Sequence, residues 1–457
     1  PKPSSAASDV YKRQVNTCTV TNIADRKSRQ MLHRAKQKNP AALVVAVGCY
    51  VQTGREDVEQ DPCIDLAIGN NRKKDLASIL EEYLQDLEQE DAVAENAENA
   101  GHGVDKTLHA TTVIDINHTA EYEEMTLKQT AEHTRAYIKI QDGCNQFCSY
   151  CVIPYARGRV RSRRAEDIIR EITGMAQNGY REIVLTGIHI SSYGIDFDEE
   201  AWKRGESVSV LKEDEERRDY SGSSKLIDLL ERIHDIEGIE RIRIGSLEPR
   251  IVTEETAARM AALPKLCPHF HLSLQSGCDA TLRRMNRKYT SEEYAESVAL
   301  LRKVFDHPAI TTDVIVGFPG ETEEEFAQTV GFLDRIQFFE MHIFKYSKRA
   351  GTRAAVMSHQ VPDPVKTTRS AELLAMEKEQ SKQFRAHYVG QEAEVLLEET
   401  KEIGGTEYLL GHTRDYVKLA VSVKENKKNV ANTVICGRVQ GFLTDEILLL
   451  SPLEFSK

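Results

Sequence analysis

The chain has 457 residues, enough for about three domains, and a formal net charge of −12. It contains no apolar stretch long enough to span a membrane, and nine scattered cysteines without a secretory leader indicate a reducing, cytoplasmic location. The acidic total argues against a nucleic-acid partner, but thirteen acidic residues and a single lysine lie between Glu81 and Glu124. That segment carries the whole excess, so the rest of the chain can present a basic surface.

Residues 1–14 are small and polar without apolar alternation, and we interpret them as a leader that is not native to the domain. Over residues 15–87 strand and helix patterns alternate, which predicts an α/β domain with a parallel sheet. Such sheets bind ligands at the carboxyl ends of their strands, where Cys18 and Cys49 both lie. The predicted elements are the end of a strand at 15–21, a basic helix at Asn22–Lys38, strands at Ala42–Val47 and Ile64–Ile68, and a helix at Arg72–Leu87.

The acidic segment at residues 88–130, rich in alanine and asparagine, is predicted to be a linker. Over residues 131–386 strands and helices alternate again, and repeated βα units predict a full or partial barrel with its active site at the carboxyl ends of the strands. We expect a charged, exposed insertion at Phe197–Ser223. The predicted strands are Thr134–Gln141, Glu182–Gly187, Arg241–Ser246, His269–Gln275, Thr311–Val316 and Phe338–Phe344, and the helices are Ala165–Asn178, Lys225–Ile236, Glu254–Leu263, Ser291–Val304, Glu323–Ile336 and Thr367–Ala386.

The last segment, residues 387–457, contains short alternating strand patterns with glycine at the turns. This spacing predicts a small β-barrel. Its predicted strands are Glu392–Glu398, Glu407–His412, Val417–Val421, Val434–Gln440 and Glu446–Leu450.

Three cysteines, Cys144, Cys148 and Cys151, stand at C-x3-C-x2-C spacing directly after the first strand of the predicted barrel. One tight loop of this kind can hold three irons of a 4Fe–4S cluster, which normally takes four thiolates. The open iron suits the amino and carboxylate groups of S-adenosylmethionine (SAM), and Tyr150 is placed to pack on the adenine. Two alternatives are disfavoured. A structural zinc site needs a fourth ligand, which this loop does not supply. A disulfide-stabilised fold is typical of short secreted chains and not of a chain of this length. The loop therefore resembles that of the radical-SAM superfamily.

Four stretches, taken with the domain order, resemble the methylthiotransferases. Within that family the resemblance is greatest to the branch that modifies N6-threonylcarbamoyladenosine in tRNA. It implies an N-terminal Rossmann- or flavodoxin-like α/β domain, truncated here, then a radical-SAM partial (β/α) barrel and a C-terminal TRAM β-barrel that binds RNA. The four stretches are Asn16–Thr21, Gln141–Cys144, Gly187–Gly194 and His271–Cys278.

The resemblance also implies an auxiliary 4Fe–4S cluster held by three cysteines of the first domain. Cys18 and Cys49 match the second and third of these, whereas residues 1–14 replace the region that carries the first. Cys63 lies off the family pattern and is a weak substitute. The remaining cysteines, Cys267, Cys278 and Cys436, are expected to be small buried hydrophobes, and His269 and His271 to pack or hydrogen-bond in the core.

Residues that follow the barrel strands are our candidates for SAM contacts, because ligands of such barrels lie at that edge. The alternative is that the glycines only form turns and the polar residues only cap helices. The candidates are Thr186, Gly187, Ser246, Glu248, Gln275, Gly317, Gly320 and Glu321.

Two basic segments are candidate RNA contacts. Arg157, Arg159, Arg161 and Arg163 follow the cysteine loop, and so dense an arginine run favours phosphate binding over a solvated loop. A second loop carries Lys348, Arg349 and Arg353 at a strand end, where it is either a contact to the tRNA anticodon loop or a plain surface turn.

The resemblance implies radical methylthiolation of carbon 2 of N6-threonylcarbamoyladenosine at tRNA position 37. That carbon bears an unactivated hydrogen, so the cofactors must supply radical chemistry, and we assign no side chain as an acid or base. The alternatives are the same chemistry on isopentenyladenosine or on a ribosomal-protein aspartate, or a non-catalytic iron–sulfur protein that binds RNA. The electron donor and the sulfur source are not indicated by the residues.

Overall fold

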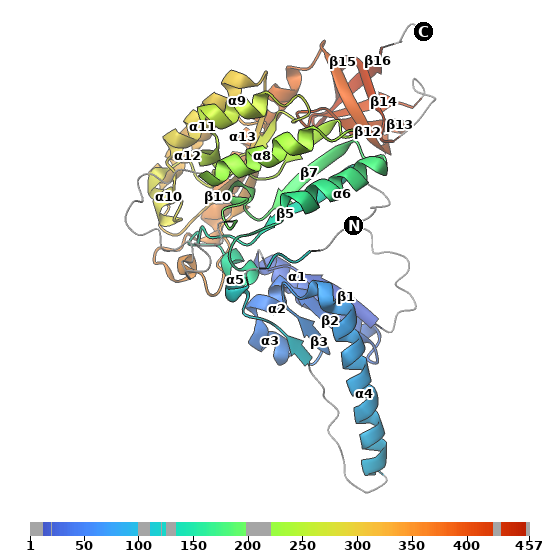
Figure 1. Ribbon diagram of the computed structural model, residues 1–457. Helices are drawn as coiled ribbons and strands as arrows, with labels where there is room; N and C mark the ends of the chain where they lie inside the picture. The colour runs from blue at the N-terminus through green and yellow to red at the C-terminus, as the bar shows by residue number, and fades with distance from the viewer. Residues whose placement is uncertain are drawn as a thin grey trace. The chain divides into compact units, whose positions relative to one another are not determined.

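The computed structural model describes residues 12–19, 21–98, 110–119, 121–124, 134–197, 221–423 and 431–453. The chain divides into two compact units, whose elements are labelled in Figure 1. The first contains residues 1–125, 143–159 and 347–355, and the second contains residues 126–142, 160–346 and 356–457. The cysteine loop and the loop at 347–355 therefore belong to the same unit as the N-terminal sheet. In the described part of the chain no helix is both long and apolar enough to cross a membrane.

The first unit is built on a parallel sheet of strand order β1-β2-β3-β4. Strand β2 is apolar at successive positions, as expected for a parallel strand covered on both faces. Val44 and Ala46 pack in one apolar cluster with Leu32 of helix α1, while Val45 and Val47 pack in another. The elements are β1 (Lys12–Thr17), α1 (Asn22–Lys38), β2 (Leu43–Gly48), α2 (Cys49–Thr53), α3 (Arg55–Glu59), β3 (Leu66–Ile68), η2 (Lys73–Asp75), α4 (Leu76–Glu98), β4 (Ala110–Thr112) and η3 (Ile116–His118).

Two elements of this unit extend beyond their predicted ends. Strand β1 begins at Lys12, inside the expected leader, because its backbone pairs with β2 from Leu43 onward. Helix α4 continues through the start of the expected linker to Glu98, since its run of alanine, glutamate, glutamine and leucine contains no glycine or proline to stop a helix. The expected leader from residue 1 to residue 11 lies outside the described residues.

The second unit contains a partial (β/α) barrel. One sheet has the order β6-β5-β7-β8 and the next β11-β10-β9, and single parallel bridges join the two sheets next to β8 and β9. All neighbouring pairs are parallel except β5 with β6. The strands are β5 (Arg135–Asp142), β6 (Arg161–Ser162), β7 (Glu182–Gly187), β8 (Arg241–Ile244), β9 (His269–His271), β10 (Ala309–Val316) and β11 (Glu340–Lys345).

The helices of this unit lie along one side of the strands (Figure 1). Alternate strand residues such as Ile138, Leu185 and Phe270 are buried under them in one apolar core, so the residues between face the other side. Thr290 and Thr322 start their helices with reciprocal side-chain caps, which explains why the predicted bounds of α11 and α12 are correct. The helices are α6 (Ala165–Gln177), α8 (Ser221–His234), α9 (Glu254–Ala261), α10 (Asp279–Arg284), α11 (Ser291–Val304), α12 (Glu323–Ile336) and α13 (Asp363–Ala386).

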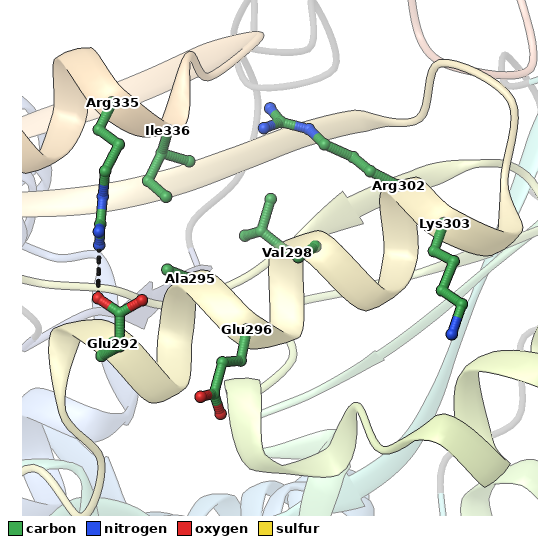
Figure 2. Close-up of a pocket in the computed structure, with 9 residues that line it drawn as sticks. Glu292, Ala295, Glu296, Val298, Arg302, Lys303, Arg335 and Ile336 are labelled. Atoms are coloured by element: carbon green, nitrogen blue, oxygen red, sulfur yellow. Dashed lines mark hydrogen bonds and ion pairs between the residues drawn. The ribbon is translucent and has the colours of Figure 1, made fainter.

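A hollow of about 540 Å³ lies on this helical layer, against α11 and the end of α12 (Figure 2). Glu292 and Arg335 form an ion pair of 2.9 Å at its edge. None of its lining residues is a predicted site residue. The hollow is therefore separate from the candidate active site. The predicted insertion at 197–223 lies almost entirely outside the described residues; helix α8 begins at Ser221.

The C-terminal strands form a closed barrel of order β12-β13-β14-β16-β15, which is consistent with a TRAM-like domain. Gly404 and Gly405 both have positive φ, of 58° and 79°, as a tight hairpin turn between β12 and β13 requires. The strands are β12 (Glu392–Ile403), β13 (Thr406–His412), β14 (Lys418–Ser422), β15 (Val434–Thr444) and β16 (Ile447–Pro452). The apolar core of this barrel also includes Ala309 and Phe339 of the (β/α) barrel, so the two barrels are packed together.

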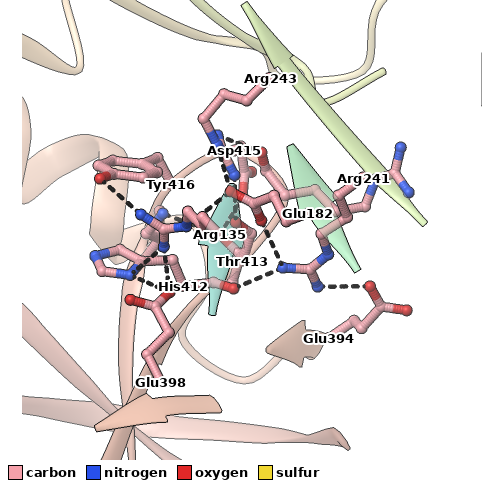
Figure 3. Close-up of polar contacts among 12 residues, drawn as sticks. Arg135, Glu182, Arg241, Arg243, Glu394, Glu398, His412, Thr413, Asp415 and Tyr416 are labelled. Atoms are coloured by element: carbon pink, nitrogen blue, oxygen red, sulfur yellow. Dashed lines mark hydrogen bonds and ion pairs between the residues drawn. The ribbon is translucent and has the colours of Figure 1, made fainter. Parts of the chain in front are cut away.

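A buried charge network joins the two barrels (Figure 3). Glu182 of β7 is fully buried and forms ion pairs with Arg135 at 2.8 Å and with Arg243 at 3.0 Å. Arg243 donates to the carbonyl of Arg414 at 3.0 Å, and Arg135 pairs with Glu398 of β12. Buried arginines need such partners, because an unpaired charge is costly in a low-dielectric interior. The network therefore connects the strand ends of one barrel to the other.

Candidate active site

The three cysteines of the C-x3-C-x2-C motif lie on a loop that closes on itself in the first unit. Gly143 opens the loop with a φ of 72°, and a Cβ there would lie 1.8 Å from the carbonyl oxygen of Arg159, so only glycine fits. The backbone N–H of Cys144 donates to the carbonyl of Gly158 at 3.0 Å, and that of Cys151 to Cys148 at 3.0 Å. These contacts hold Cys144, Cys148 and Cys151 on one short turn, each partly exposed.

Aromatic and basic side chains brace the same loop. Phe147, with a φ of 48°, packs edge-on against Tyr155 of helix α5 (Ile153–Arg157), and the guanidinium of Arg159 lies 4.6 Å from the centre of the Phe147 ring. The backbone of Ala354 donates to the carbonyl of Ser149 at 2.8 Å. The loop is thus shaped by side chains that are not themselves ligands.

The donor set fits a 4Fe–4S cluster with one open iron. All nine cysteines are free of disulfides, and the loop presents three sulfurs with a spacing that leaves a fourth coordination position to another molecule. The predicted role of Tyr150 beside SAM stays a prediction, as do the three cysteine ligands. A zinc site of three sulfurs on this loop would still need a fourth ligand.

Cys18 and Cys49 lie at the carboxyl ends of the neighbouring parallel strands β1 and β2, where Thr17 pairs with Gly48. Cys18 is exposed, whereas Cys49 is buried at the start of α2. The sulfur of Cys49 accepts a hydrogen bond from the side-chain amide of Asn70 at 3.5 Å. Cys49 also packs in one apolar cluster with Val152 and Ala156. The auxiliary-cluster candidate Cys49 therefore lies beside the helix that follows the SAM-cluster candidates.

Cys63 lies in a different environment, grouped with His33 and Asp61. Its backbone N–H donates to Asp61 at 3.0 Å, and burial together with the nearby Asp61 carboxylate raises the pKa of the Cys63 thiol. A thiol with a raised pKa is a weaker ligand, because the thiolate is the form that binds metal.

The arginine run divides into accessible and buried members. Arg157 and Arg159 are partly exposed, and their predicted RNA contact stays a prediction. Arg161 and Arg163 are only 1 % and 3 % exposed, which differs from the expectation of phosphate contact. Arg161 lies 3.8 Å from Asp142, and Arg163 is paired with Glu171. Both guanidiniums thus face carboxylates inside the second unit and not solvent.

The second basic loop is divided in the same way. Lys348 and Arg353 are exposed, but Arg349 is 7 % exposed and turned inward. Its guanidinium pairs with Asp25 at 2.7 Å and donates to Asn22 at 2.8 Å. Arg349 therefore anchors the loop to the start of α1, which leaves Lys348 and Arg353 as the predicted RNA contacts.

The candidate SAM residues at the barrel strand ends differ in accessibility. Gly187 and Ser246 are exposed and Thr186 is partly exposed, so these three can face a ligand. Gln275 is buried with a φ of 74°, a strained conformation for a residue other than glycine, which marks it as a constrained position. Glu248 is 3 % exposed and is paired with Arg250 at 2.6 Å.

The Gly317–Glu321 loop is closed by its own side chain. Glu321 is 7 % exposed, accepts a hydrogen bond from the backbone N–H of Gly317 at 2.9 Å and pairs with Arg369 at 2.6 Å. Burial raises the pKa of the Glu321 carboxyl, despite these two partners. Gly317 has a φ of 69°, and a Cβ there would lie 2.3 Å from Lys366. Glu321 therefore stabilises the loop in this structure, which differs from the predicted direct contact with SAM. Gly320 lies in the same turn and has a φ of 78°.

His189 and Arg250 lie beside Glu248, and neither residue was predicted from the sequence to be part of the site. His189 lies 4.0 Å from the Glu248 carboxylate, and its backbone N–H donates to the buried Gln141 side chain at 2.8 Å. Burial lowers the pKa of His189, although Glu248 opposes that shift. The available signal was the position of His189 within the stretch Gly187–Gly194 that carried the family resemblance.

Comparisons with known proteins identify the class of the protein. The family model described as "Radical SAM superfamily" matches residues 138–333, and the one described as "Uncharacterized protein family UPF0004" matches residues 3–69. A solved structure of the radical S-adenosylmethionine methyltransferase TsrM from Kitasatospora setae, with cobalamin and a [4Fe-4S] cluster bound, aligns with a TM-score of 0.52 at 14% identity. That alignment covers 77% of this chain and 64% of the other. The family model, together with the fold, thus defines a radical-SAM enzyme.

Curated relatives narrow the class. The threonylcarbamoyladenosine tRNA methylthiotransferase MtaB of Bacillus subtilis (strain 168) is 36% identical over 92% of this chain and 83% of its own length. MtaB of Aquifex aeolicus (strain VF5) is 37% identical over 88% of this chain and 86% of its own length. The tRNA-2-methylthio-N(6)-dimethylallyladenosine synthase of Thermoanaerobacter sp. (strain X514) is 35% identical over 84% of this chain and 73% of its own length.

The chain belongs to the radical-SAM tRNA methylthiotransferase family. It is an enzyme that uses a 4Fe–4S cluster and SAM, and the family, fold-class and cofactor predictions are confirmed.

Proposed function

We propose that this enzyme methylthiolates carbon 2 of N6-threonylcarbamoyladenosine at position 37, in the anticodon loop of cytoplasmic tRNA. The observation that carries the choice of substrate is the alignment of 92% and 88% of the chain with two relatives named for that nucleoside, at 36% and 37% identity. Relatives named for dimethylallyladenosine are 32–35% identical in sequence to this chain. The polar side chains of His271, Asp313 and His342, whose donor atoms lie within 4.8 Å of one another, also suit a polar substituent better than a hydrocarbon one.

The chain's own contribution to the reaction is to hold and orient its cofactors. We assign Cys144, Cys148 and Cys151 to the 4Fe–4S cluster whose open iron binds SAM. When bound, these cofactors supply the radical chemistry that replaces an unactivated carbon–hydrogen bond. Gly143 and the Phe147 packing hold the loop in shape, and Thr186, Gly187 and Ser246 are the accessible residues for positioning SAM.

Cys18 and Cys49 are assigned to the auxiliary cluster of the family, from which sulfur would be supplied. The hydrogen bond from Asn70 to the Cys49 sulfur supports this role, because hydrogen bonds to cluster sulfurs tune reduction potential. Arg157, Arg159, Lys348 and Arg353 are assigned to tRNA phosphates, since they are the accessible members of the two basic segments.

The test is nucleoside mass spectrometry of tRNA from a strain that lacks the gene. The 2-methylthio form of threonylcarbamoyladenosine should be absent and its unmodified parent should accumulate. A plasmid copy should restore the product, and a copy with Cys148→Ala should not. If that product persists while the 2-methylthio form of isopentenyladenosine disappears, the substrate assignment is wrong. A change confined to a ribosomal protein would contradict it in the same way.

A further inference from the structure

Three potential metal ligands lie together on neighbouring strands of the (β/α) barrel. His271 is on β9, Asp313 on β10 and His342 on β11, and their donor atoms all lie within 4.8 Å of one another. His271 pairs in register with Thr311, two positions before Asp313, and Asp313 pairs directly with His342. The strand register therefore places the three side chains on one face of the sheet.

That face is the inner one. Phe270, Val314 and Met341, each adjacent in sequence to one of the three, are buried in the apolar core under the helices. Because side chains alternate along a strand, His271, Asp313 and His342 point to the opposite side. The side chains of His271 and Asp313 are 13% and 29% exposed, and His342 is exposed. The three groups are thus accessible from the concave side of the barrel.

The geometry is that of ligands around a common centre rather than of a direct ion pair. His271 Nε2 lies 3.4 Å from Asp313 Oδ2. A charge-assisted hydrogen bond is about 2.7–2.9 Å long, whereas two ligand atoms bound to one metal at about 2.1 Å stand about 3.4 Å apart at the tetrahedral angle. The rings of His271 and His342 are nearly parallel, with centres 5.8 Å apart.

A second contact orients His271. Its Nδ1 is hydrogen-bonded to Thr311 Oγ1 at 3.0 Å, which directs Nε2 toward Asp313. Histidines that bind metals commonly hold the other ring nitrogen in such a bond, because it fixes the orientation of the ring.

A second group of similar composition among the described residues, His33 with Asp61 and Cys63, lacks this geometry. His33 Nε2 lies 2.7 Å from Asp61 Oδ2, which is a direct hydrogen bond with no room for an ion between the two atoms. This group is therefore an ordinary histidine–aspartate pair with a neighbouring thiol, and it provides a control for the site in the barrel.

We propose that His271, Asp313 and His342 bind a divalent first-row transition-metal ion, and that its open positions bind the carboxylate of the substrate's threonylcarbamoyl group. Two imidazoles and one carboxylate form a donor set that such ions accept while keeping positions free. Two neutral histidines, one carboxylate and one divalent ion carry a net positive charge, which complements a substrate carboxylate. A dimethylallyl group offers no ligand atom. The identity of the bound group rests on the proposed function.

The test is a titration of the anaerobically prepared full chain with Mn²⁺, with the cluster kept oxidised, followed through the EPR signal of free Mn²⁺. We expect about one Mn²⁺ bound per chain and binding at least about tenfold weaker in His342→Ala. The exposed side chain of His342 makes that substitution mild for folding, which a thermal melt can verify. His33→Ala is the matched control and should bind Mn²⁺ like the wild type. Equal binding in wild type and His342→Ala, or none in either, overturns the site.

A second measurement addresses the substrate. Adding N6-threonylcarbamoyladenosine should change the EPR spectrum of the bound Mn²⁺, and N6-dimethylallyladenosine should not. A spectrum that threonylcarbamoyladenosine leaves unchanged overturns the role in binding the carboxylate. Failure of the proposed function is recognised separately, because it appears in the nucleoside composition of tRNA from the deletion strain and not in metal binding.

Discussion

The side-chain amide of Asn70 lies 3.5 Å from the sulfur of Cys49, and it donates a second hydrogen bond to the carbonyl of Ala156 at 2.7 Å. Cys49 starts α2 in the N-terminal sheet domain, whereas Ala156 belongs to the helix that follows the cysteine loop. One buried amide therefore links the two cysteine-bearing segments within the first unit.

Replacement of Asn70 by alanine should lower the free energy of unfolding by about 1–3 kcal/mol, because the buried carbonyl of Ala156 loses a hydrogen-bond donor. Chemical denaturation of the two proteins measures the difference. Asn39→Ala is the control, since Asn39 makes only a local bond to the backbone of Ala41 and a surface change of this kind costs within about 0.5 kcal/mol. Equal losses in both variants would contradict the role of Asn70.

Iron content tests the cluster assignments. The proposed function requires both clusters, so we expect about eight irons per anaerobically reconstituted chain, four from each cluster. Cys148→Ala and Cys49→Ser should each lower the number to about four irons, because each removes a ligand of one cluster. Cys278→Ala, a buried cysteine of the barrel, is the control. A value near four irons in the unaltered chain would mean that the auxiliary cluster does not form.

Glu182→Gln should destabilise the protein strongly. Glu182 is fully buried between Arg135 and Arg243, so its neutralisation removes the buried carboxylate that pairs with both, although Arg135 keeps its pair with Glu398; the expected cost is about 3–5 kcal/mol. Glu166→Gln, which breaks the exposed pair with Arg232, should leave the free energy of unfolding nearly unchanged, because water screens an exposed ion pair. Urea unfolding distinguishes the two, and a small effect of Glu182→Gln would show that the network is not stabilising.

Stability should fall as the pH drops below the ordinary histidine value of 6.5, and His269 should contribute to that fall. Burial, aided by the nearby Arg243, holds the pKa of His269 well below that value. The unfolded chain therefore binds a proton that the folded chain does not, and protonation favours unfolding. The melting temperature of His269→Phe, whose ring can still stack on Tyr416, should decline less between pH 7.5 and about pH 5.5 than that of the wild type. Parallel declines would exclude His269 as a source of the pH dependence.

Substitution of the exposed basic residues of the second basic loop should affect tRNA binding, whereas substitution of its buried arginine should affect stability. Lys348→Ala combined with Arg353→Ala should weaken tRNA binding and lower the salt dependence by about one phosphate contact for each residue, with little change in stability. Arg349→Ala should instead lower the free energy of unfolding, by about 3–5 kcal/mol, because it leaves Asp25 without its buried partner. Filter binding at several salt concentrations and denaturant titration measure the two effects. Loss of stability in the double variant would contradict an exposed RNA-binding role.

Local patterns were enough to predict several parts of this protein. The spacing of Cys144, Cys148 and Cys151 is a property of one short loop, so three thiolates must come together whatever the rest of the chain does. The bounds of α1, α11 and α12 are correct because N-terminal caps and apolar periodicity are written in consecutive residues. The alternation of strands and helices likewise determined the fold class.

Only the tertiary structure decided which charged residues face solvent. Arg161, Arg163 and Arg349 look like the exposed arginines beside them, but Asp142, Glu171 and Asp25 bind them at positions that no local pattern connects. The grouping of His271, Asp313 and His342 depends on the register of three parallel strands, which the chain reaches only after two helical crossovers. The chemistry of a side chain can be read from its own position in the sequence, whereas its partners are determined by long-range packing. For that reason the cysteine motif could be predicted from the sequence and the residues around it could not.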